Sequence, residues 1–123
     1  MNKKEILIMQ DQNFYRGDIY MAFFPRIGKI DSEQYGTRPV LIVQNDIGNK
    51  YSPNIIVAPI TTKTSRLPTH VSIEGFGLLQ RSTVSCESIC TISKARLLHR
   101  IGTLGGYEAM EAVDQALINS LGL

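Results

Sequence analysis

The apolar stretch Val40-Leu41-Ile42-Val43, together with the similar stretch Ile55-Ile56-Val57-Ala58, determines the expected fold. Both stretches are rich in β-branched residues. Turn-forming residues bound them, at 45–49 after the first stretch and at 52–54 before the second. Runs that are apolar on both faces are typical of strands buried in the core of a barrel or a sandwich. The sequence therefore predicts a β protein built around these two strands.

Further strands are expected on both sides of this pair. Apolar or β-prone runs next to turn residues predict strands at residues 19–24, 70–73 and 99–102, and a longer strand at residues 82–92. Ser93 is expected to cap a single helical turn at residues 93–97. Both cysteines, Cys86 and Cys90, lie in the 82–92 segment. A spacing of roughly 13 Å along one extended strand would exclude a disulfide between them.

The last part of the chain is expected to form one amphipathic helix, at residues 107–121. Small and apolar side chains fall on one stripe at helical spacing: Ala109, Val113, Ala116, Leu117, Ser120 and Leu121. The glycines at 105–106 cannot cap the free N–H groups of the helix, but Glu108 and Glu111 suit the positive end of its dipole. Many short strands and one helix indicate a mainly β fold, a strongly bent sheet or partly open barrel with the C-terminal helix packed across it.

The size and composition of the chain exclude several classes of protein. A length of 123 residues with 43% hydrophobic residues is enough for one domain with one core. No apolar run approaches the roughly 18 residues of a membrane span. The apolar patch at residues 6–9 is shorter than the roughly seven residues of a secretory signal. Two cysteines are too few for a zinc site on their own, and neither histidine has a ligand-like spacing. We therefore expect a cytoplasmic protein without membrane, metal or cofactor.

The charge is unevenly distributed along the chain. The last nineteen residues contain Glu108, Glu111 and Asp114 and no Lys or Arg. The remainder contains thirteen Lys and Arg against eight Asp and Glu, a net charge of +5. A net positive charge on the chain before its last nineteen residues is compatible with a polyanionic partner such as RNA or DNA.

Two polar loops carry the candidate chemistry. The first, at residues 25–37, ends before Arg38-Pro39, where the proline restricts the preceding backbone and fixes where the arginine side chain leaves the strand. Such an arginine can bind phosphate with two parallel donors, or it can simply be a surface residue. The second loop, at residues 61–66, has four hydroxyls and two cations, and either wraps a phosphate or forms an exposed hairpin. The two histidines, His70 and His99, are either an acid–base pair or structural.

Seven short motifs, in a fixed order, resemble the MazF/PemK toxins. They are Arg16-Gly17-Asp18-Ile19-Tyr20, Gly36-Thr37-Arg38-Pro39-Val40-Leu41-Ile42-Val43-Gln44-Asn45-Asp46, Ser52-Pro53, Ala58-Pro59-Ile60-Thr61, Leu67-Pro68-Thr69-His70-Val71, Glu87-Ser88-Ile89-Cys90-Thr91-Ile92, and Ala116-Leu117 with Ser120-Leu121-Gly122-Leu123. The similarity extends from about Tyr15 to the last residue. We therefore expect one MazF/PemK-like domain at residues 15–123, preceded by an N-terminal extension at residues 1–14.

The resemblance implies both a fold and an activity. The fold would be an SH3-like, CcdB/MazF-type β-barrel with a C-terminal helix, assembled as a homodimer. The activity would be that of a toxin of a toxin–antitoxin system. Such a toxin is an endoribonuclease that cuts single-stranded RNA at short sequences without metal. It leaves a 2′,3′-cyclic phosphate and a 5′-hydroxyl and blocks translation. A cognate antitoxin would inhibit it by laying an acidic C-terminal segment across the RNA site.

The resemblance also implies site residues. The catalytic arginine and threonine of the family correspond to Arg38 and Thr61. The RNA-binding residues that we expect are Glu33, Gln34, Asn45, Lys63, Leu67, His70 and Glu87. Arg38 can donate two parallel hydrogen bonds to the developing phosphorane charge, and Thr61 can add a neutral donor. Because an arginine with a pKa above about 12 is a poor base, we expect electrostatic stabilisation to be its larger contribution.

Two other functions are compatible with the same fold class. A non-catalytic toxin of this fold, of the gyrase-poison type, would bind through its C-terminal residues. Gyrase poisons lack the arginine and the threonine and tend to end in a Trp-bearing segment, whereas this chain has both residues and no Trp. A module for proline-rich peptides would need a cluster of exposed aromatic side chains, and aromatics make up only 7% of the chain.

Overall fold

The computed structural model describes residues 2–3, 13–25, 35–64 and 66–123. Its strands are β1 (Asp18–Phe24), β2 (Gly36–Ile42), β3 (Asn54–Thr61), β4 (His70–Ile73), β5 (Ser82–Ser85), β6 (Cys90–Ser93) and β7 (Leu97–Thr103). Its helices are α2 (Asp46–Tyr51), the 3₁₀ turn η1 (Lys94–Arg96) and α3 (Glu108–Leu121). Most of the expected N-terminal extension, and the expected RNA-binding residues Glu33 and Gln34, lie outside the described residues.

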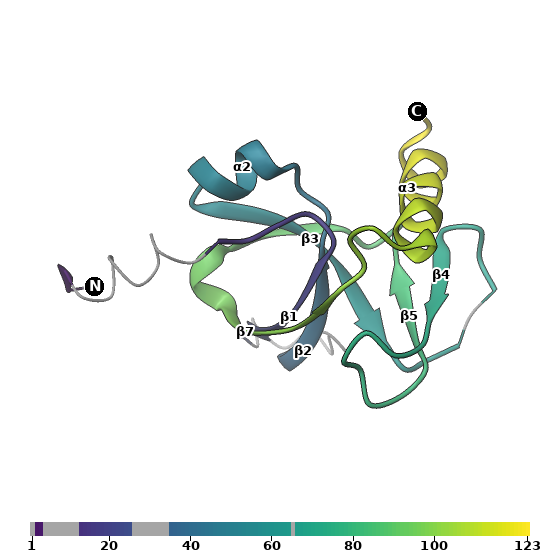
Figure 1. Cartoon of the computed structure of the whole chain (residues 1–123), viewed down its shortest axis with the longest axis horizontal. Coiled ribbons are helices and arrows are strands. Elements are labelled where there is room, and N and C mark those ends of the chain that lie inside the picture. Colours follow the sequence, from purple (N-terminus) through teal and green to yellow (C-terminus); the bar gives the residue numbers. More distant parts are fainter. Residues whose placement is uncertain (1, 4–12, 26–34, 65) are drawn as a thin grey trace.

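The strands form one antiparallel sheet in the order β4-β5-β3-β2-β1-β7, with β6 paired to β3. β3 belongs to two parts of the sheet because it changes partners along its length. Its first half pairs with β6, and its last two residues, Ile60 and Thr61, pair with Val84 and Thr83 of β5. Figure 1 shows β1, β2 and β7 curling to one side of β3, and β4 and β5 lying on the other side beneath α3. Between the described strands no pairing joins β4 to β7, so the bent sheet stays open.

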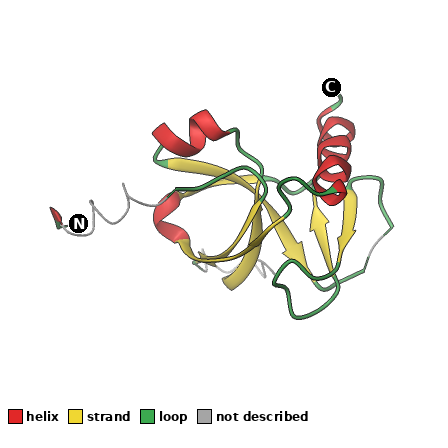
Figure 2. Cartoon of the chain, in the orientation of Figure 1, coloured by secondary structure: helices red, strands yellow, loops and turns green. Residues whose placement is uncertain are grey.

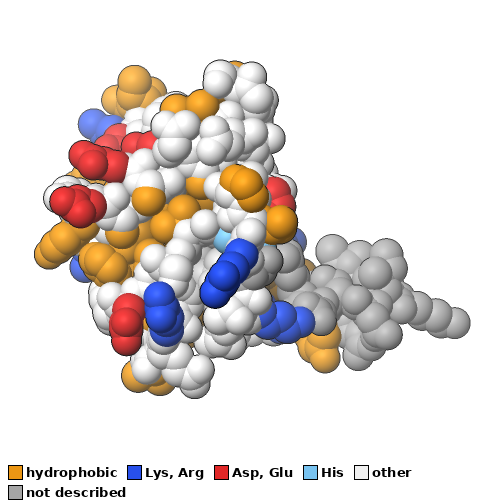
Figure 3. All heavy atoms as spheres, turned by 90° about the vertical axis from the view of Figure 1, so that its right-hand side faces the viewer, with side chains coloured by type: hydrophobic (Ala, Val, Ile, Leu, Met, Phe, Trp, Pro, Cys, Tyr) orange, Lys and Arg blue, Asp and Glu red, His pale blue; other side chains and the backbone are white. Residues whose placement is uncertain are grey.

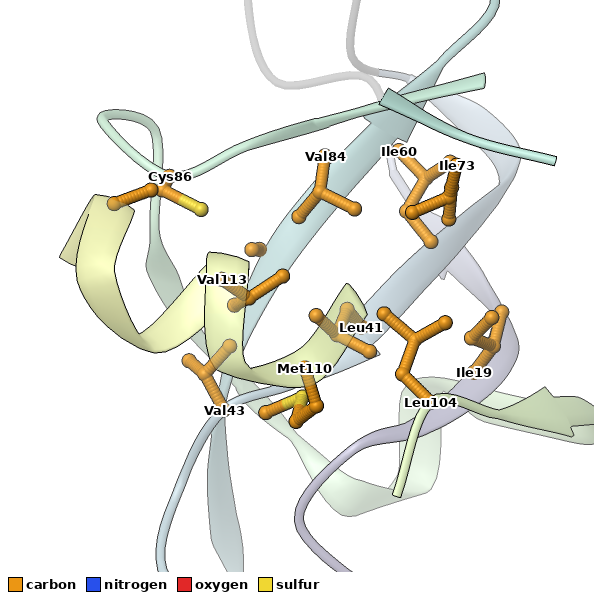
Figure 4. Close-up of a cluster of buried hydrophobic side chains, with 12 residues drawn as sticks. Ile19, Leu41, Val43, Ile60, Ile73, Val84, Cys86, Leu104, Met110 and Val113 are labelled. Carbon is orange, nitrogen blue, oxygen red and sulfur yellow. The ribbon is translucent and has the colours of Figure 1, made fainter. Parts of the chain in front are cut away.

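The centre of the sheet, at the end of β2 and in β3, is buried on both faces, as the two apolar stretches predicted. Val40 and Ile42 belong to a cluster inside the curled part of the sheet, with Ile55, Val57 and Leu97. The alternate residues of the same stretch, Leu41 and Val43, belong to a second cluster, beneath α3. Figure 4 shows Met110 and Val113 of α3 facing the second cluster. Along β2 and β3, successive apolar side chains therefore pack alternately into the two cores, because neighbouring residues of a strand point to opposite faces.

The C-terminal helix was predicted correctly, and α3 buries Met110, Val113 and Ala116 against the sheet. Tyr107 precedes the helix without a side-chain cap, as the flanking glycines implied. Gly122 ends α3 with a left-handed φ of 71°, and the N–H of Leu123 bonds to the carbonyl of Ile118. The helical turn after Ser93 is also confirmed, because the Ser93 hydroxyl accepts the N–H of Ala95 at 3.2 Å. Figure 2 shows these helices at separate places around the sheet.

The expected turn at residues 45–49 is wrong, because this segment begins α2. Asn45 is the N-cap, and its Oδ1 accepts the N–H of Gly48 at 2.8 Å. Asn49 is buried and holds the helix to the preceding chain, with its side-chain amide bonded to the carbonyl of Gln44 and to Asp46. Asparagine favours both turns and helix N-caps, so the sequence signal was ambiguous.

The expected single strand at residues 82–92 is also wrong. β5 ends at Ser85, the N–H of Ser88 bonds to the Ser85 carbonyl in a turn, and β6 begins at Cys90. Both strands pair with β3, β6 along residues 54–57 and β5 at residues 60–61, and β5 alone also pairs with β4, so the turn at residues 86–89 separates two strands with different neighbours. The extended spacing assumed for the two cysteines therefore does not apply, although Cys86 and Cys90 are both free thiols.

None of the helices in the described part of the chain has the length and apolar character of a membrane span.

Candidate active site

A pocket opens where β2 and β3 separate. The two strands pair from Ile42–Val57 to Val40–Pro59, and β3 then turns to pair with β5. The pocket between their ends has a volume of about 230 Å³. It is lined by Tyr35, Thr37, Arg38, Pro39, Ile60, Thr61, Thr62 and Ser82. Arg38 and Thr61, which come from different strands, therefore face one pocket.

Arg38 lies inside β2 rather than at its start. β2 begins at Gly36, and Arg38 is opposite Ala22 of β1. The arginine is half-buried, and its Nε donates a long hydrogen bond of 3.4 Å to the carbonyl oxygen of Tyr35. No carboxylate of the described residues forms an ion pair with it. The terminal nitrogens of the guanidinium can therefore bind an anion in the pocket as a two-donor fork.

Thr61 is the last residue of β3. Its Oγ1 accepts the backbone N–H of Lys63 at 3.2 Å, which fixes the rotamer of the side chain. A hydroxyl that accepts one hydrogen bond still has its own proton to donate. Thr61 can therefore act as a neutral donor in the same pocket as Arg38. Lys63 itself lies on the exposed segment that follows β3.

His70 and Glu87, two of the expected RNA-binding residues, form one hydrogen-bonded cluster. The His70 Nε2 and the Glu87 Oε1 are 2.5 Å apart. The same oxygen accepts the Ser85 hydroxyl at 3.0 Å, and Oε2 accepts the Thr69 hydroxyl at 2.7 Å. Burial alone would raise the pKa of the Glu87 carboxyl. Hydrogen bonds from Thr69, His70, its own backbone and Ser85 outweigh that effect and lower the pKa to about 2. Glu87 therefore holds the start of β4 to the turn after β5.

Glu87→Gln is expected to remove a part of the stability that depends on pH. Because the pKa of Glu87 falls from 4.5 to about 2 on folding, the ionised carboxylate stabilises the fold above about pH 4.5, and this contribution is lost as the pH falls toward 2. Urea unfolding of both proteins between about pH 7 and pH 2.5 measures the effect. The difference in unfolding free energy between the wild type and Glu87→Gln should be constant near neutrality and should decrease below about pH 4.5. A gap that does not change with pH would contradict this role.

The strand register connects the pocket to this cluster. Thr61 is opposite Thr83 of β5, and Thr83 is opposite Ser72 of β4. Residues directly opposite each other in a sheet point to the same face. Continuing the β2–β3 register by two residues brings Arg38 opposite Thr61. We call the line Arg38, Thr61, Thr83 and Ser72 the cross-strand polar row.

The His70 cluster lies on the same face as the cross-strand polar row. Ser85 and His70 are opposite each other, two residues along β5 and β4 from Thr83 and Ser72. Two residues along a strand correspond to roughly 7 Å, so both groups can contact one extended ligand. The intervening residues Val71 and Val84 point to the opposite face, toward the core beneath α3.

The remaining expected site residues lie apart from the pocket. Asn45 caps α2, so its side-chain oxygen already has a structural partner. Leu67 is half-exposed before β4, and its carbonyl accepts the N–H of His70. The two histidines do not form a pair, because His99 lies on β7 and lines a different pocket. Sequence inspection missed Tyr35, Ser82, Thr83 and Ser85, since only the strand register indicates that these residues adjoin the site.

The second pocket, of about 390 Å³, adjoins the first and shares Pro39, Thr62 and Ser82 with it. Its other walls are mostly apolar and come from β1, β7 and the loop after β4: Met21, Gly77, Leu78, Leu79, Gln80, His99 and Ile101. Leu79 is fully exposed at its rim. The polar pocket therefore opens directly onto an apolar one.

Two arginines, Arg16 and Arg100, lie close to acidic side chains of the fold. Arg16 is tied to the fold, because its guanidinium pairs with Asp114 of α3 at 2.7 Å and its Nε donates to the Val43 carbonyl. Arg100 lies 3.6 Å from the buried Asp18. In Figure 3, which looks onto the β4–β5 side, Lys and Arg side chains lie beside a partly covered histidine, and most acidic side chains lie toward the left margin.

The described residues contain no group of three His, Cys, Asp or Glu side chains arranged to hold a metal ion.

Comparison with known proteins agrees with this geometry. The sequence model of a family described as PemK-like, MazF-like toxin of type II toxin–antitoxin system matches residues 15–121. The chain is 46% identical over 112 residues to Endoribonuclease EndoA of Bacillus subtilis (strain 168), which covers 88% of this chain and 94% of that protein. Among solved structures it resembles a mycobacterial endoribonuclease in complex with its cognate antitoxin, with a TM-score of 0.74, 25% identity, and coverage of 89% of this chain and 96% of that one. It also resembles Mycobacterium tuberculosis toxin MazF-mt6, with a TM-score of 0.72, 33% identity, and coverage of 86% and 97%. These matches confirm the expected MazF-type fold.

Proposed function

Because the chain belongs to the PemK-like, MazF-like toxins of type II toxin–antitoxin systems, we propose that it is an endoribonuclease that cuts single-stranded RNA at a short sequence. The reaction needs no metal ion and leaves a 2′,3′-cyclic phosphate and a 5′-hydroxyl. The observation that carries this proposal is the presence of Arg38 and Thr61 in one pocket. The relationship to a protein named as an endoribonuclease supports it. Cutting messenger RNA in the cytoplasm would block translation and growth.

The chemistry requires charge stabilisation in the pocket. The RNA 2′-oxygen gives its proton to solvent and bonds to the adjacent phosphorus, and negative charge builds up on the phosphorane oxygens. The bond from phosphorus to the 5′-oxygen then breaks, and the 5′-oxygen takes a proton from solvent. Arg38 donates from its terminal nitrogens to two of these oxygens, since its Nε is directed to Tyr35. Thr61 donates its hydroxyl proton to the same charge, because Lys63 occupies its acceptor side.

The proposal is tested by mapping RNA ends. Purified protein is incubated with a long RNA of mixed sequence in EDTA, and the new ends are sequenced and tested for phosphorylation by polynucleotide kinase. We expect discrete cuts at one short motif, with 5′-hydroxyl ends that the kinase labels directly. Intact RNA from a folded protein would overturn the proposal and make the non-catalytic, gyrase-directed toxin the next function to test.

We propose a cognate antitoxin as the protein partner. The relative that was solved with its cognate antitoxin supports this proposal. An acidic C-terminal antitoxin segment suits a face that carries Arg38 without a carboxylate partner among the described residues. Such a segment would compete with the RNA phosphates for the same donors.

We also propose that the toxin is a homodimer. An apolar groove of about 510 Å³ runs beside the end of α3, and Ile118, Leu121 and Leu123 on its rim are exposed. An exposed apolar groove of this kind favours burial in an interface. We expect a solution mass of about twice 13.7 kDa by light scattering. Leu121→Asp should shift the protein toward the monomer, and Ala112→Asp, an exposed position of α3 that does not line the groove, should not. A monomer at all concentrations would contradict the dimer.

A further inference from the structure

The cross-strand polar row ends beside an arginine to which no role has been assigned. Arg81 directly precedes β5, and its Nε donates to the Ser72 hydroxyl at 3.1 Å. Ser72 is the β4 member of the row. The guanidinium of Arg81 therefore lies at one end of the row, and that of Arg38 lies at the other. The two ends are three strand spacings apart, roughly 14 Å.

We propose that Ser72 and Arg81 form a second phosphate-binding subsite for the RNA backbone. The RNA would cross the strands along the polar row, with the scissile phosphate at Arg38 and a flanking phosphate at Arg81. This inference rests on the proposed ribonuclease function and specifies how the RNA lies in that site.

The contacts of Arg81 leave it able to bind a phosphate. The hydrogen bond from Nε to Ser72 fixes the guanidinium plane and leaves its terminal nitrogens as a two-donor fork. Arg81 is exposed, and no described carboxylate forms an ion pair with it. Glu74 is the nearest acidic residue in the register, since it would be opposite Arg81 if the β4–β5 pairing continued. No ion pair joins the two side chains, in contrast to the Arg16–Asp114 pair.

The surface between the two arginines also favours a polyanion. Ser72 is exposed, Thr61 is half-buried and Thr83 is buried, and all three are neutral hydroxyl residues, so no carboxylate of the row itself repels a phosphate backbone. Two acidic side chains of the described residues lie near the row. Glu87 has both oxygens occupied by hydrogen-bond donors, and Glu74 forms no ion pair with Arg81. Hydroxyl and arginine side chains are the usual partners of phosphate oxygens in nucleic-acid complexes, and such contacts position the backbone without reading sequence.

The test measures how the affinity for RNA depends on salt. Binding of fluorescent single-stranded 2′-O-methyl RNA, which lacks the attacking hydroxyl, is followed by anisotropy in EDTA between about 50 and 300 mM KCl. Each phosphate contact contributes about 0.7 to the slope of log affinity against log salt for a single strand. We expect Arg81→Gln to weaken binding about 3- to 10-fold and to make the slope shallower by about 0.7. Ser72→Ala should weaken binding less, because the charge remains.

The matched control is Arg96→Gln. Arg96 belongs to η1, which lies at the far side of the curled sheet from β4 and β5 (Figure 1), and its loss removes the same charge away from the row. We expect Arg96→Gln to bind RNA like the wild type. Melting curves establish that each variant is folded.

The two proposals fail in different ways. An unchanged slope in Arg81→Gln, or an equal change in Arg96→Gln, would overturn the subsite even if the wild type cuts RNA. Wild-type protein that leaves natural RNA intact would overturn the ribonuclease proposal, and the binding slopes would still decide the role of Arg81. In cleavage assays, Arg81→Gln should raise KM about 3- to 10-fold and leave kcat nearly unchanged, since a flanking phosphate is bound equally in the ground state and the transition state.

Discussion

Arg38→Ala is expected to reduce the kcat of RNA cleavage by about 10³-fold without changing the fold. Arg38 is the cation of the pocket between β2 and β3, and its terminal nitrogens are the donors best placed for the phosphorane charge. Loss of one preorganised donor to a developing oxyanion typically costs about 10²- to 10³-fold. The Arg38 side chain is only half-buried and its one hydrogen bond to the described residues is a long one, so its removal leaves both cores intact. Single-turnover cleavage of an RNA that contains the mapped motif measures the effect.

Two companion variants separate charge from geometry. Arg38→Lys keeps a positive charge but loses the planar fork, so it should recover only a small part of the activity. Thr61→Val keeps the shape of the side chain and removes the hydroxyl donor, and we expect a loss of about 10- to 10²-fold. Unfolding midpoints of all three variants should stay near the wild-type value. A folded Arg38→Ala protein that cuts at the wild-type rate would remove Arg38 from the mechanism.

Gly102→Ala is expected to be among the most destabilising small substitutions in the described fold. A Cβ at Gly102 would overlap the backbone carbonyl oxygen of Phe76, which comes from the loop between β4 and β5. The reverse contact is equally tight, since a Cβ at Gly77 would overlap the Ile101 carbonyl. Backbone atoms cannot move aside as a flexible side chain can. We therefore expect a loss of about 3 kcal/mol or more in unfolding free energy, and a fall in Tm of at least about 10 °C.

The control for this prediction is Gly75→Ala, in the same loop. Gly75 has a φ of 91°, but a Cβ there would meet nothing within 4 Å. Its substitution should therefore cost only the strain of a left-handed backbone, about 1–2 kcal/mol. Urea unfolding of both variants distinguishes the two effects. Equal losses of unfolding free energy would mean that backbone strain, and not the close approach of the loop to β7, decides stability here.

This close approach also shapes the site. Phe76 itself has a φ of 54° and packs edge-on against Tyr107 at the start of α3, with ring centroids 5.3 Å apart. The loop is therefore held against β7 on one side and α3 on the other. Gly77, Leu78 and Leu79 of the same loop line the apolar pocket beside Arg38 and Thr61. The packing that makes Gly102 intolerant of substitution thus also fixes the walls next to the candidate active site.

Local sequence patterns predicted most of the secondary structure. The burial of Val40, Leu41, Ile42 and Val43 in two cores follows from a run that is apolar at every position. α3 follows from helical periodicity, and the turn after Ser93 follows from a capping side chain. The errors at residues 45–49 and 82–92 arose where the local signal permits two structures. For residues 82–92 the outcome depends on which strands pair with the segment, and for residues 45–49 it depends on the side-chain bonds of Asn45 and Asn49 that hold α2.

Residue type and local spacing were enough to predict the β-rich fold class and the C-terminal helix, because these depend on local patterns. The family, and Arg38 and Thr61 as catalytic candidates, followed from the resemblance of the ordered motifs to the MazF/PemK toxins. The strand pairing showed that β3 leaves β2 to pair with β5, which opens the pocket between Arg38 and Thr61. The tertiary structure alone aligned Ser72 and Arg81 with that pocket and joined His70 to Glu87. The physical reason is that strand register and strand partners are set by contacts between residues distant in the chain, where shifting the register by one residue moves every side chain to the opposite face.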